Sequence, residues 1–326
     1  MRKHALRFAW LIAGIMFVAV PIAYAAEVVL YSSNPSELQD MVRVGFEKET
    51  GIKVSAVKMG TGEAMKRIQA EKDNPLCDVF WSGDVAVLDG TKDYFMSYKS
   101  AEAAVLPAGY VEKEYRWTSS NAHVMIIMYN KSLVSESDKP LAWKDLFDPK
   151  WKDKIVMANP EKSGSAYAQA YGLYKLYEWD GLKKLIANAK VLDSSSLIYK
   201  GVAAGEYPLG ITMEYAAYRY IAGGSKDVGI IYPSDGAFVA PEGAAIIKNC
   251  PHPDEAKLFF DYLLSKSTEE EVFKNFYRRP ARPDTAEFPG LPKISDIAVL
   301  KEFDPIEANA IKKDLLAKWK EIILSK

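Results

Sequence analysis

The stretch Val28-Val29-Leu30-Tyr31-Ser32-Ser33-Asn34-Pro35-Ser36-Glu37 sets the pattern that the rest of the chain repeats. Its first four residues are apolar or aromatic and predict a short buried strand. Asn34, Pro35 and Glu37 are suited to the N-cap, N1 and N3 positions of a helix that follows. A strand that passes through a small polar loop into a helix is the repeating unit of an α/β fold.

The same order of strand, polar loop and helix recurs along the chain. The loops that follow the later predicted strands are Gly60-Thr61-Gly62, Ser82-Gly83-Asp84, Ser163-Gly164-Ser165, Ser194-Ser195-Ser196 and Thr212-Met213-Glu214-Tyr215. Strands that alternate with helices predict a mostly parallel sheet. We therefore predict an α/β protein with two lobes, between which the chain passes more than once.

The composition is that of an ordinary folded protein. The 326 residues include 42 Lys or Arg and 43 Asp or Glu, and 49% are hydrophobic. These values argue against a disordered or collagen-like chain, and the length favours two domains. A nearly neutral chain lacks the clustered basic excess that nucleic-acid binding requires, so nucleic acid is not an expected partner.

Residues 1–25 have the features of a secretory signal peptide. Arg2, Lys3 and Arg7 form a basic start, residues 8–20 are uncharged and apolar, and Ala23-Tyr24-Ala25 resembles a cleavage site. A membrane anchor is the alternative, but the apolar run is short for a span of about 20 residues. We predict cleavage after Ala25 and a mature, exported, periplasmic protein.

The two cysteines, Cys77 and Cys250, would then fold in an oxidising compartment. Their positions leave two possibilities open, one long-range disulfide or two separately buried thiols. No C-x-x-C spacing suggests a metal site.

The polar loops are the candidate ligand site. A helix N-terminus offers unpaired N–H groups and about half a positive charge to an anion. Ser, Thr and Asn are also common N-caps, so one such loop alone indicates little. Several of them form a site only where the fold brings the carboxyl ends of the strands together, as open α/β sheets do.

Motifs for enzymes and cofactors are absent from the sequence. Gly60-x-Gly62 lacks the third glycine of a dinucleotide fingerprint, because Met65 stands there, and no phosphate-binding P-loop, G-x-S-x-G or H-E-x-x-H motif occurs. The mature chain has only His123 and His252 for a triad or a metal cluster. We predict no cofactor, no catalytic residue and no resident metal; a secreted phosphoryl-transfer or hydrolytic enzyme is the remote alternative.

The order of these segments resembles a known family. The resemblance rests on residues 28–33, Phe46-Glu47-x-x-Thr50-Gly51-Ile52-Lys53-Val54, Asp78-Val79-Phe80-Trp81, Trp151-Lys152-x-Lys154-Ile155 and Ala204-Gly205-Glu206-x-Pro208. Together they are similar to periplasmic solute-binding proteins of ABC importers, in the extracellular solute-binding family 1 group that includes ferric-ion, thiamine, phosphonate and sugar-phosphate binders. The resemblance implies a type II fold, with the ligand held in a cleft between two α/β lobes.

The resemblance also implies a division of the chain. Residues 26–125 would form the first part of lobe 1, 126–239 lobe 2, 240–290 the return to lobe 1, and 291–326 a C-terminal helical segment packed on lobe 2. The returning strand, residues 239–247, would lie antiparallel to residues 78–81. That arrangement would bring Cys77 and Cys250 together and favours a disulfide between them.

Ferric-binding members of this family typically use a His, a Glu and two adjacent Tyr. The corresponding residues here are Pro35, Gly83 and Glu214-Tyr215, so only Tyr215 matches. The part of the family's site that binds an anion does match residues of this sequence. It implies ligand contacts from Ser163, Gly164, Ser165 and Ser195 in lobe 2 and from Ser32, Ser33, Thr61 and Ser82 in lobe 1.

The resemblance therefore implies a monomeric binding protein for a small phosphorylated or phosphonate solute, of the hexose phosphate or aminoethylphosphonate type. Glu214 would bind the rest of the ligand, and the permease subunits of an importer would be the partners. Ferric-ion binding through Tyr215 with a synergistic anion is the alternative.

Overall fold

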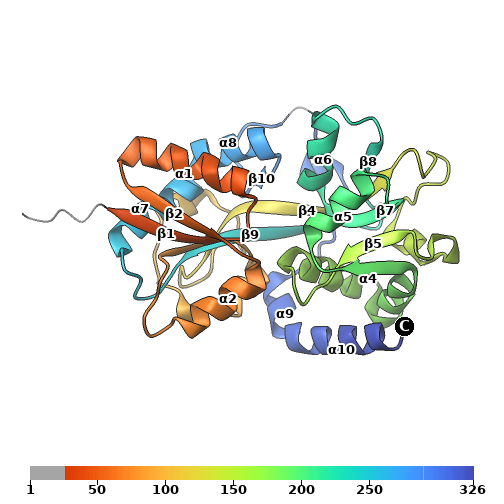
Figure 1. Ribbon diagram of the computed structural model, residues 1–326, viewed down its shortest axis with the longest axis horizontal. Coiled ribbons are helices and arrows are strands. Elements are labelled where there is room, and N and C mark those ends of the chain that lie inside the picture. The colour runs from red at the N-terminus through yellow and green to blue at the C-terminus, as the bar shows by residue number, and fades with distance from the viewer. Residues whose placement is uncertain (1–25, 289) are drawn as a thin grey trace, which may run out of the picture.

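A computed structural model describes residues 26–288 and 290–326, so the predicted signal peptide lies outside the described residues. The chain forms two α/β lobes that lie side by side, and the long strands β4 (Thr118–Asn130) and β9 (Phe238–Ile246) run between them (Figure 1). This is the predicted type II arrangement. Within the described ranges, no helix has the length and apolar character needed to cross a bilayer.

The first lobe, called lobe 1 below, contains the strands and helices that precede β4 in the chain and those that directly follow β9. They are β1 (Glu27–Ser32), α1 (Ser36–Thr50), β2 (Lys53–Lys58), α2 (Thr61–Ala70), β3 (Val79–Asp84), α3 (Val85–Asp89), α7 (Pro253–Leu264), α8 (Lys266–Phe276) and the short β10 (Arg279–Pro280). Short 3-10 helices cover Lys92–Tyr94 and Ala101–Val105.

Lobe 2 contains the middle of the chain and its C-terminal helices. Its elements are β5 (Ile155–Ala158), α4 (Gly164–Asn188), β6 (Ala189–Leu192), α5 (Ser195–Ala203), β7 (Leu209–Met213), α6 (Glu214–Ala222), β8 (Val228–Ile231), α9 (Pro305–Ala310) and α10 (Lys312–Leu324). Further 3-10 helices are Trp143–Phe147, Pro149–Trp151 and Ile294–Asp296.

The strands of the described residues form one continuous sheet, in the order β2-β1-β3-β9-β4-β7-β5-β6, with β8 and β10 paired to β4. Strand β1 is parallel to β2 and β3, and β5 is parallel to β6 and β7. Strands β9 and β4 are antiparallel to each other and to their neighbours β3 and β7. The carboxyl ends of both parallel sets therefore open toward the junction of the lobes.

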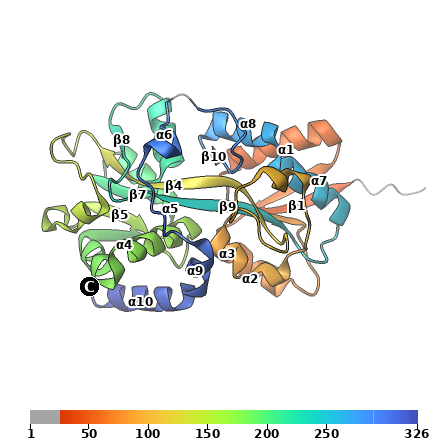
Figure 2. The ribbon, with the colours of Figure 1, turned by 180° about the vertical axis from the view of Figure 1, so that it is seen from behind.

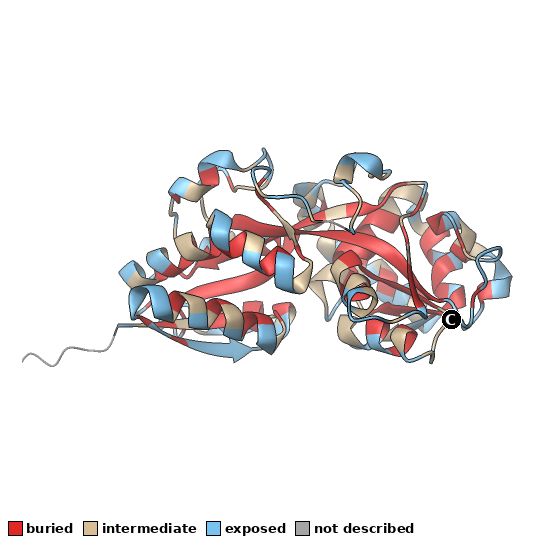
Figure 3. Ribbon diagram, turned by 90° about the horizontal axis from the view of Figure 1, so that it is seen from above, coloured by how far each residue is buried: buried red, intermediate tan, exposed pale blue. Residues whose placement is uncertain are grey.

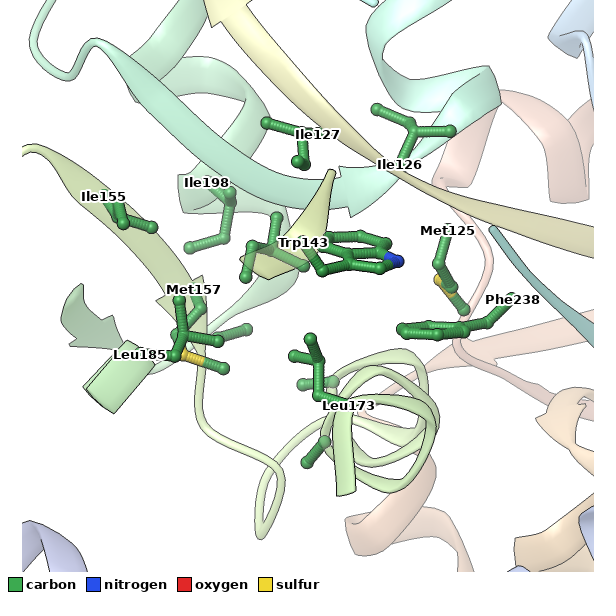
Figure 4. Close-up of a cluster of buried hydrophobic side chains, with 14 of the residues drawn as sticks. Met125, Ile126, Ile127, Trp143, Ile155, Met157, Leu173, Leu185, Ile198 and Phe238 are labelled. Carbon is green, nitrogen blue, oxygen red and sulfur yellow. The ribbon is translucent and has the colours of Figure 1, made fainter. Parts of the chain in front are cut away.

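Each lobe has its own hydrophobic core. Figure 4 shows that of lobe 2, where Trp143 stacks on Phe238 with ring centroids 5.0 Å apart. The crossing strands are buried along their length, whereas the outer faces of the helices are exposed (Figure 3). Leu315 and Trp319 of α10 join the lobe 2 core, and α9 contacts α3 of lobe 1 (Figure 2). The C-terminal segment thus touches both lobes.

Two helix starts differ from the sequence-based prediction. Helix α1 begins at Ser36 with Pro35 in the N-cap position and without a side-chain cap, so Asn34 is not the cap. Helix α2 begins at Thr61, so Thr61 and Gly62 of the predicted loop belong to the helix. Neither helix has a side-chain cap, and the Thr61 hydroxyl donates to Ser33 instead.

The predicted disulfide is not present. Cys77 and Cys250 are free, buried thiols in the hydrophobic core of lobe 1. Strand β9 does lie antiparallel to β3, but β9 ends at Ile246 and the chain turns at Asn249, where φ is 57°, before it reaches Cys250. Burial raises the pKa of both thiols, that of Cys250 to about 12. Burial therefore favours the neutral thiol at both positions.

Candidate functional site

A cavity of about 670 Å³ lies between the lobes, and its walls come from the predicted polar loops. Lobe 1 supplies residues from the carboxyl ends of β1, β2 and β3, and lobe 2 from those of β5, β6 and β7. The crossing strands supply His123 and Glu242. This position, outside the carboxyl ends of the strands, is where open α/β sheets bind ligands.

Three hydroxyl groups form the wall of lobe 1. Thr61 donates to the Ser33 oxygen at 3.1 Å, and Ser33 in turn donates to the backbone carbonyl oxygen of Ser82. Ser82 sits in a bulge of β3 with φ of 80°, a conformation that side-chain-bearing residues rarely adopt. The bulge interrupts the pairing of β3 with β9 and places Ser82 at the cavity.

The wall of lobe 2 is a triangle of hydroxyl groups, called the serine cluster below. The Ser163 and Ser195 oxygens are 2.7 Å apart, those of Ser165 and Ser195 3.0 Å, and those of Ser163 and Ser165 3.1 Å. Ser163 is the N-cap of α4, and Ser195 is the first residue of α5. Two helix N-termini therefore meet at this cluster, and both favour an anion there.

The two walls approach each other at Gly164. A Cβ atom at this position would lie 3.3 Å from Cβ of Asp84 and 3.8 Å from the Thr61 hydroxyl oxygen, which both belong to lobe 1. The absence of a side chain at residue 164 thus permits the contact between lobes. Burial raises the pKa of Asp84 to about 7, against the opposing effect of the Ala86 N–H that it accepts at 3.0 Å.

A cluster of polar and charged side chains also lines the cavity, beside the hydroxyl groups of its two walls. Arg278 donates to Oε2 of Glu242 at 2.7 Å and lies 3.1 Å from Nε2 of His123, which is itself 3.1 Å from the same carboxylate oxygen. Burial opposes ionisation of Glu242, but the neighbouring His123 and Arg278 outweigh it and lower the pKa of Glu242 to about 2. This carboxylate is therefore ionised in the cavity at any physiological pH.

Tyr215 is the tyrosine that the sequence singled out. Its hydroxyl accepts from Nη2 of Arg278 at 3.2 Å, and the guanidinium carbon lies 4.3 Å from the ring centroid. Burial raises the pKa of Tyr215 to about 12, so the phenol is protonated. Among the residues that the structure describes, no three His, Cys, Asp or Glu side chains are grouped to hold a metal ion.

The model of the bacterial extracellular solute-binding proteins matches residues 74–302 of this chain. The chain belongs to that family. The match includes the crossing strands and the serine cluster.

Two relatives and one solved structure are similar to this chain. The solute-binding protein is 25% identical over 264 residues to the Fe(3+)-binding periplasmic protein of Serratia marcescens, covering 76% of each chain. It is 23% identical over 257 residues to the putative 2-aminoethylphosphonate-binding periplasmic protein of Salmonella typhi, covering 73% and 72%. The periplasmic binding protein AfuA from Actinobacillus pleuropneumoniae, solved with exogenous fructose-6-phosphate bound, shares its fold, with a TM-score of 0.86 at 23% identity over 92% of this chain and 99% of that one.

Most of the predicted site residues of the solute-binding protein line this cavity. They are Ser33, Thr61, Ser82, Ser163, Gly164, Ser165, Ser195 and Tyr215. Ser32 is not among the lining residues; it is fully buried behind the wall, where its hydroxyl accepts from the Asn34 N–H at 3.2 Å.

Glu214 does not line the cavity either. Its carboxylate is buried in an ion pair with Arg279, with two contacts of 2.7 Å, and accepts from the Tyr232 hydroxyl at 2.6 Å. Helix α6 starts at Glu214, and successive helical residues point about 100° apart, so Glu214 and Tyr215 face different directions. The expected role of Glu214 as a ligand-binding carboxylate has no support in this geometry.

Sequence reasoning missed the charged residues of the solute-binding site. His123, Glu242 and Arg278 come from strands or loops with no recognisable motif, and pairing of β9 and β10 with β4 brings them together. Asp84 stood in a quoted loop but had no assigned role. The remaining charged residues of the lining are Glu37, Lys58, Lys162, Asp193, Lys200 and Arg219.

Proposed function

We propose that this solute-binding protein is a periplasmic receptor that captures a small phosphorylated or phosphonate solute and delivers it to the permease subunits of an ABC importer. Its family and the predicted signal peptide support export and transport. The observation that carries the choice of solute is the serine cluster, with its three hydroxyl oxygens 2.7–3.1 Å apart at two helix N-termini.

Hydroxyl groups in this arrangement suit a phosphoryl group. A hydroxyl hydrogen can rotate from a neighbouring oxygen to a ligand, so each member of the cluster can donate one hydrogen bond. Donation to a charged oxygen is about twice as strong as donation to a neutral one. Ser33, Thr61 and Ser82 offer a second set of hydroxyls from lobe 1, so the anion would be held from both sides.

The charges of the lining also favour an anion. Five Lys or Arg side chains and four Asp or Glu side chains line the cavity. The charges of Asp193 and Lys162 cancel in a pair of 2.8 Å, and the raised pKa of Asp84 leaves this acid partly protonated near neutral pH. The cavity is therefore net basic, without a buried lysine aimed at the anion.

Ferric ion is the second candidate, because the relative from Serratia marcescens is named for it. A ferric site needs several anionic oxygen ligands. Tyr215 lies against the Arg278 guanidinium, whose positive charge would repel a trivalent cation. This geometry supports the phosphorylated solute over iron.

Transport would follow from closure of the lobes. A ligand held by Ser165 on one side and Thr61 on the other makes both sets of contacts only when the lobes are together, so binding favours that state. The relatives named above are binding proteins, which supports release of the solute unchanged rather than its turnover. We propose that the receptor works as a monomer.

Calorimetric titration tests this function. The mature protein is stripped of ligand by unfolding and refolding and titrated with fructose 6-phosphate, 2-aminoethylphosphonate, inorganic phosphate and ferric citrate. We expect saturable binding of at least one phosphorus compound and no binding of iron. Phosphorus NMR of the released compound should show that it is chemically unchanged. Binding of iron alone, with a tyrosinate charge-transfer colour that Tyr215→Phe removes, would contradict the proposal.

A further inference from the structure

The cavity is too large for a phosphoryl group alone. Pockets of about 300–1,000 Å³ bind whole small molecules, and this one measures about 670 Å³. If the serine cluster holds the phosphoryl group, the rest of the solute must lie against other lining residues. The polar group on the crossing strands, made of Glu242, His123 and Arg278 and called the Glu242 cluster below, is available for this role.

The Glu242 cluster is strongly buried. The side chains of Arg278, His123 and Glu242 are 3%, 5% and 11% exposed, respectively. Burying an ion pair costs more desolvation energy than apolar residues of the same size would, so such a pair is weak evidence for stability. Because the Glu242 cluster lines a ligand cavity, we attribute its presence to ligand binding rather than to stability.

The contacts fix the orientation of the carboxylate. Both Arg278 and His123 lie against Oε2 of Glu242. A hydrogen bond from Ser82 also helps to lower the pKa of this acid, and a carboxylate has further lone pairs with which it can accept from a ligand. An ionised, pre-oriented acceptor can recognise only a hydrogen-bond donor.

We infer that Glu242, held in place by Arg278 and His123, accepts a hydrogen bond from a hydroxyl group of the solute, so that the ligand class is a hydroxyl-bearing phosphate ester. This inference rests on the proposed function, because it assumes that the phosphoryl group occupies the serine cluster.

The surrounding charges distinguish a hydroxyl from other donors and acceptors. An ammonium group beside Glu242 would also lie beside the Arg278 guanidinium, 2.7 Å from the same carboxylate, and like charges so close repel. A carboxylate on the solute would face the ionised Glu242. A neutral hydroxyl avoids both penalties and supplies the hydrogen that the carboxylate needs.

The test compares three ligands on the wild-type protein and on Glu242→Gln. Fructose 6-phosphate carries hydroxyls, ethyl phosphate carries none, and 2-aminoethylphosphonate carries an ammonium. We expect the wild type to bind fructose 6-phosphate at least about ten-fold more tightly than the other two, which corresponds to a hydrogen bond to a charged group. Glu242→Gln should remove this preference and change the affinity for ethyl phosphate less than three-fold.

Glu214→Gln is the matched control, since Glu214 is also buried and paired with an arginine but lies outside the cavity lining. It should lower stability and keep the preference. Equal wild-type affinity for the three compounds, or a preference that survives Glu242→Gln, would overturn the inference while leaving the proposed function intact. Should Glu242→Gln not fold, Glu242→Asp replaces it, with the same expected loss. Failure of every phosphorus compound to bind the wild type would overturn the proposed function and this inference together.

Discussion

The hydroxyl oxygens of Ser163 and Ser195 lie 2.7 Å apart, although 32 positions separate the two residues in the chain. Parallel pairing of β5 with β6 produces this contact, because it aligns the strand ends from which α4 and α5 begin. The pairing of the sheet therefore brings the serine cluster together, and each of its members lies at the N-terminus of a helix. The central functional claim depends on this contact.

Ser165→Ala tests the cluster most cleanly, because Ser163 also caps α4 and its loss would affect folding. Loss of one donor to a charged ligand oxygen should weaken phosphate-ester binding by about 1.5–3 kcal/mol. Calorimetry measures this change, with Ser267→Ala on the exposed face of α8 as the control. Affinity within two-fold of the wild type would show that Ser165 does not donate to the ligand.

Gly164→Ala tests the contact between the lobes. The added methyl group would lie 3.3 Å from Cβ of Asp84, tighter than an ordinary contact. We expect ligand affinity to fall several-fold while the free energy of unfolding of the ligand-free protein stays level or rises, because alanine favours helices over glycine by about 1 kcal/mol. Gly62→Ala is the control, since its methyl would meet the nearest atom at an ordinary 3.8 Å. Equal effects of the two substitutions on affinity would argue against closure at Gly164.

Asp84 should make stability depend on pH. Its pKa is raised from 3.8 to about 7, so the folded protein binds this proton more tightly than the unfolded chain. Its contribution to the free energy of unfolding is full below pH 4 and is lost as the pH rises to about 7, by at most about 4 kcal/mol.

Asp84→Asn keeps the oxygen that caps α3 but cannot titrate. Urea unfolding at pH 4 and pH 8 should therefore show a larger loss of stability for the wild type than for the variant. Glu269, whose pKa burial raises to about 9, titrates in both proteins and cancels in the difference. Identical losses would mean that Asp84 is ionised throughout.

Thiol titration tests the state of the cysteines. Because Cys77 and Cys250 are buried free thiols, the native protein should react slowly with a thiol reagent. The protein unfolded without reductant should expose two reactive thiols, and prior reduction should not change that number. A count of zero before reduction and two after it would establish the disulfide that the family resemblance suggested.

The sequence predicted those features that depend on local order. Alternating strands and small polar loops indicated the α/β class, and Ser163, Ser165 and Ser195 follow strand ends that any parallel sheet brings to one edge. The antiparallel return of β9 beside β3 was also correctly expected from the family resemblance.

Features that depend on side-chain direction and exact register could not be predicted. Glu214 and Tyr215 are neighbours in sequence, yet one pairs with Arg279 and the other faces the cavity. Glu242 and Arg278 meet only through pairing of separate segments with β4. The turn at Asn249 separates Cys250 from the end of β9, and no local pattern predicted whether the two cysteines would pair.

The most direct test of the account is a crystal structure of the protein with the phosphorus compound that binds most tightly in calorimetry. The account predicts the phosphoryl oxygens within hydrogen-bond distance of the Ser165 and Ser195 hydroxyls, and a ligand hydroxyl against the Glu242 carboxylate. A phosphoryl group bound at Arg278 instead, with the serine cluster facing the organic part of the ligand, would contradict it.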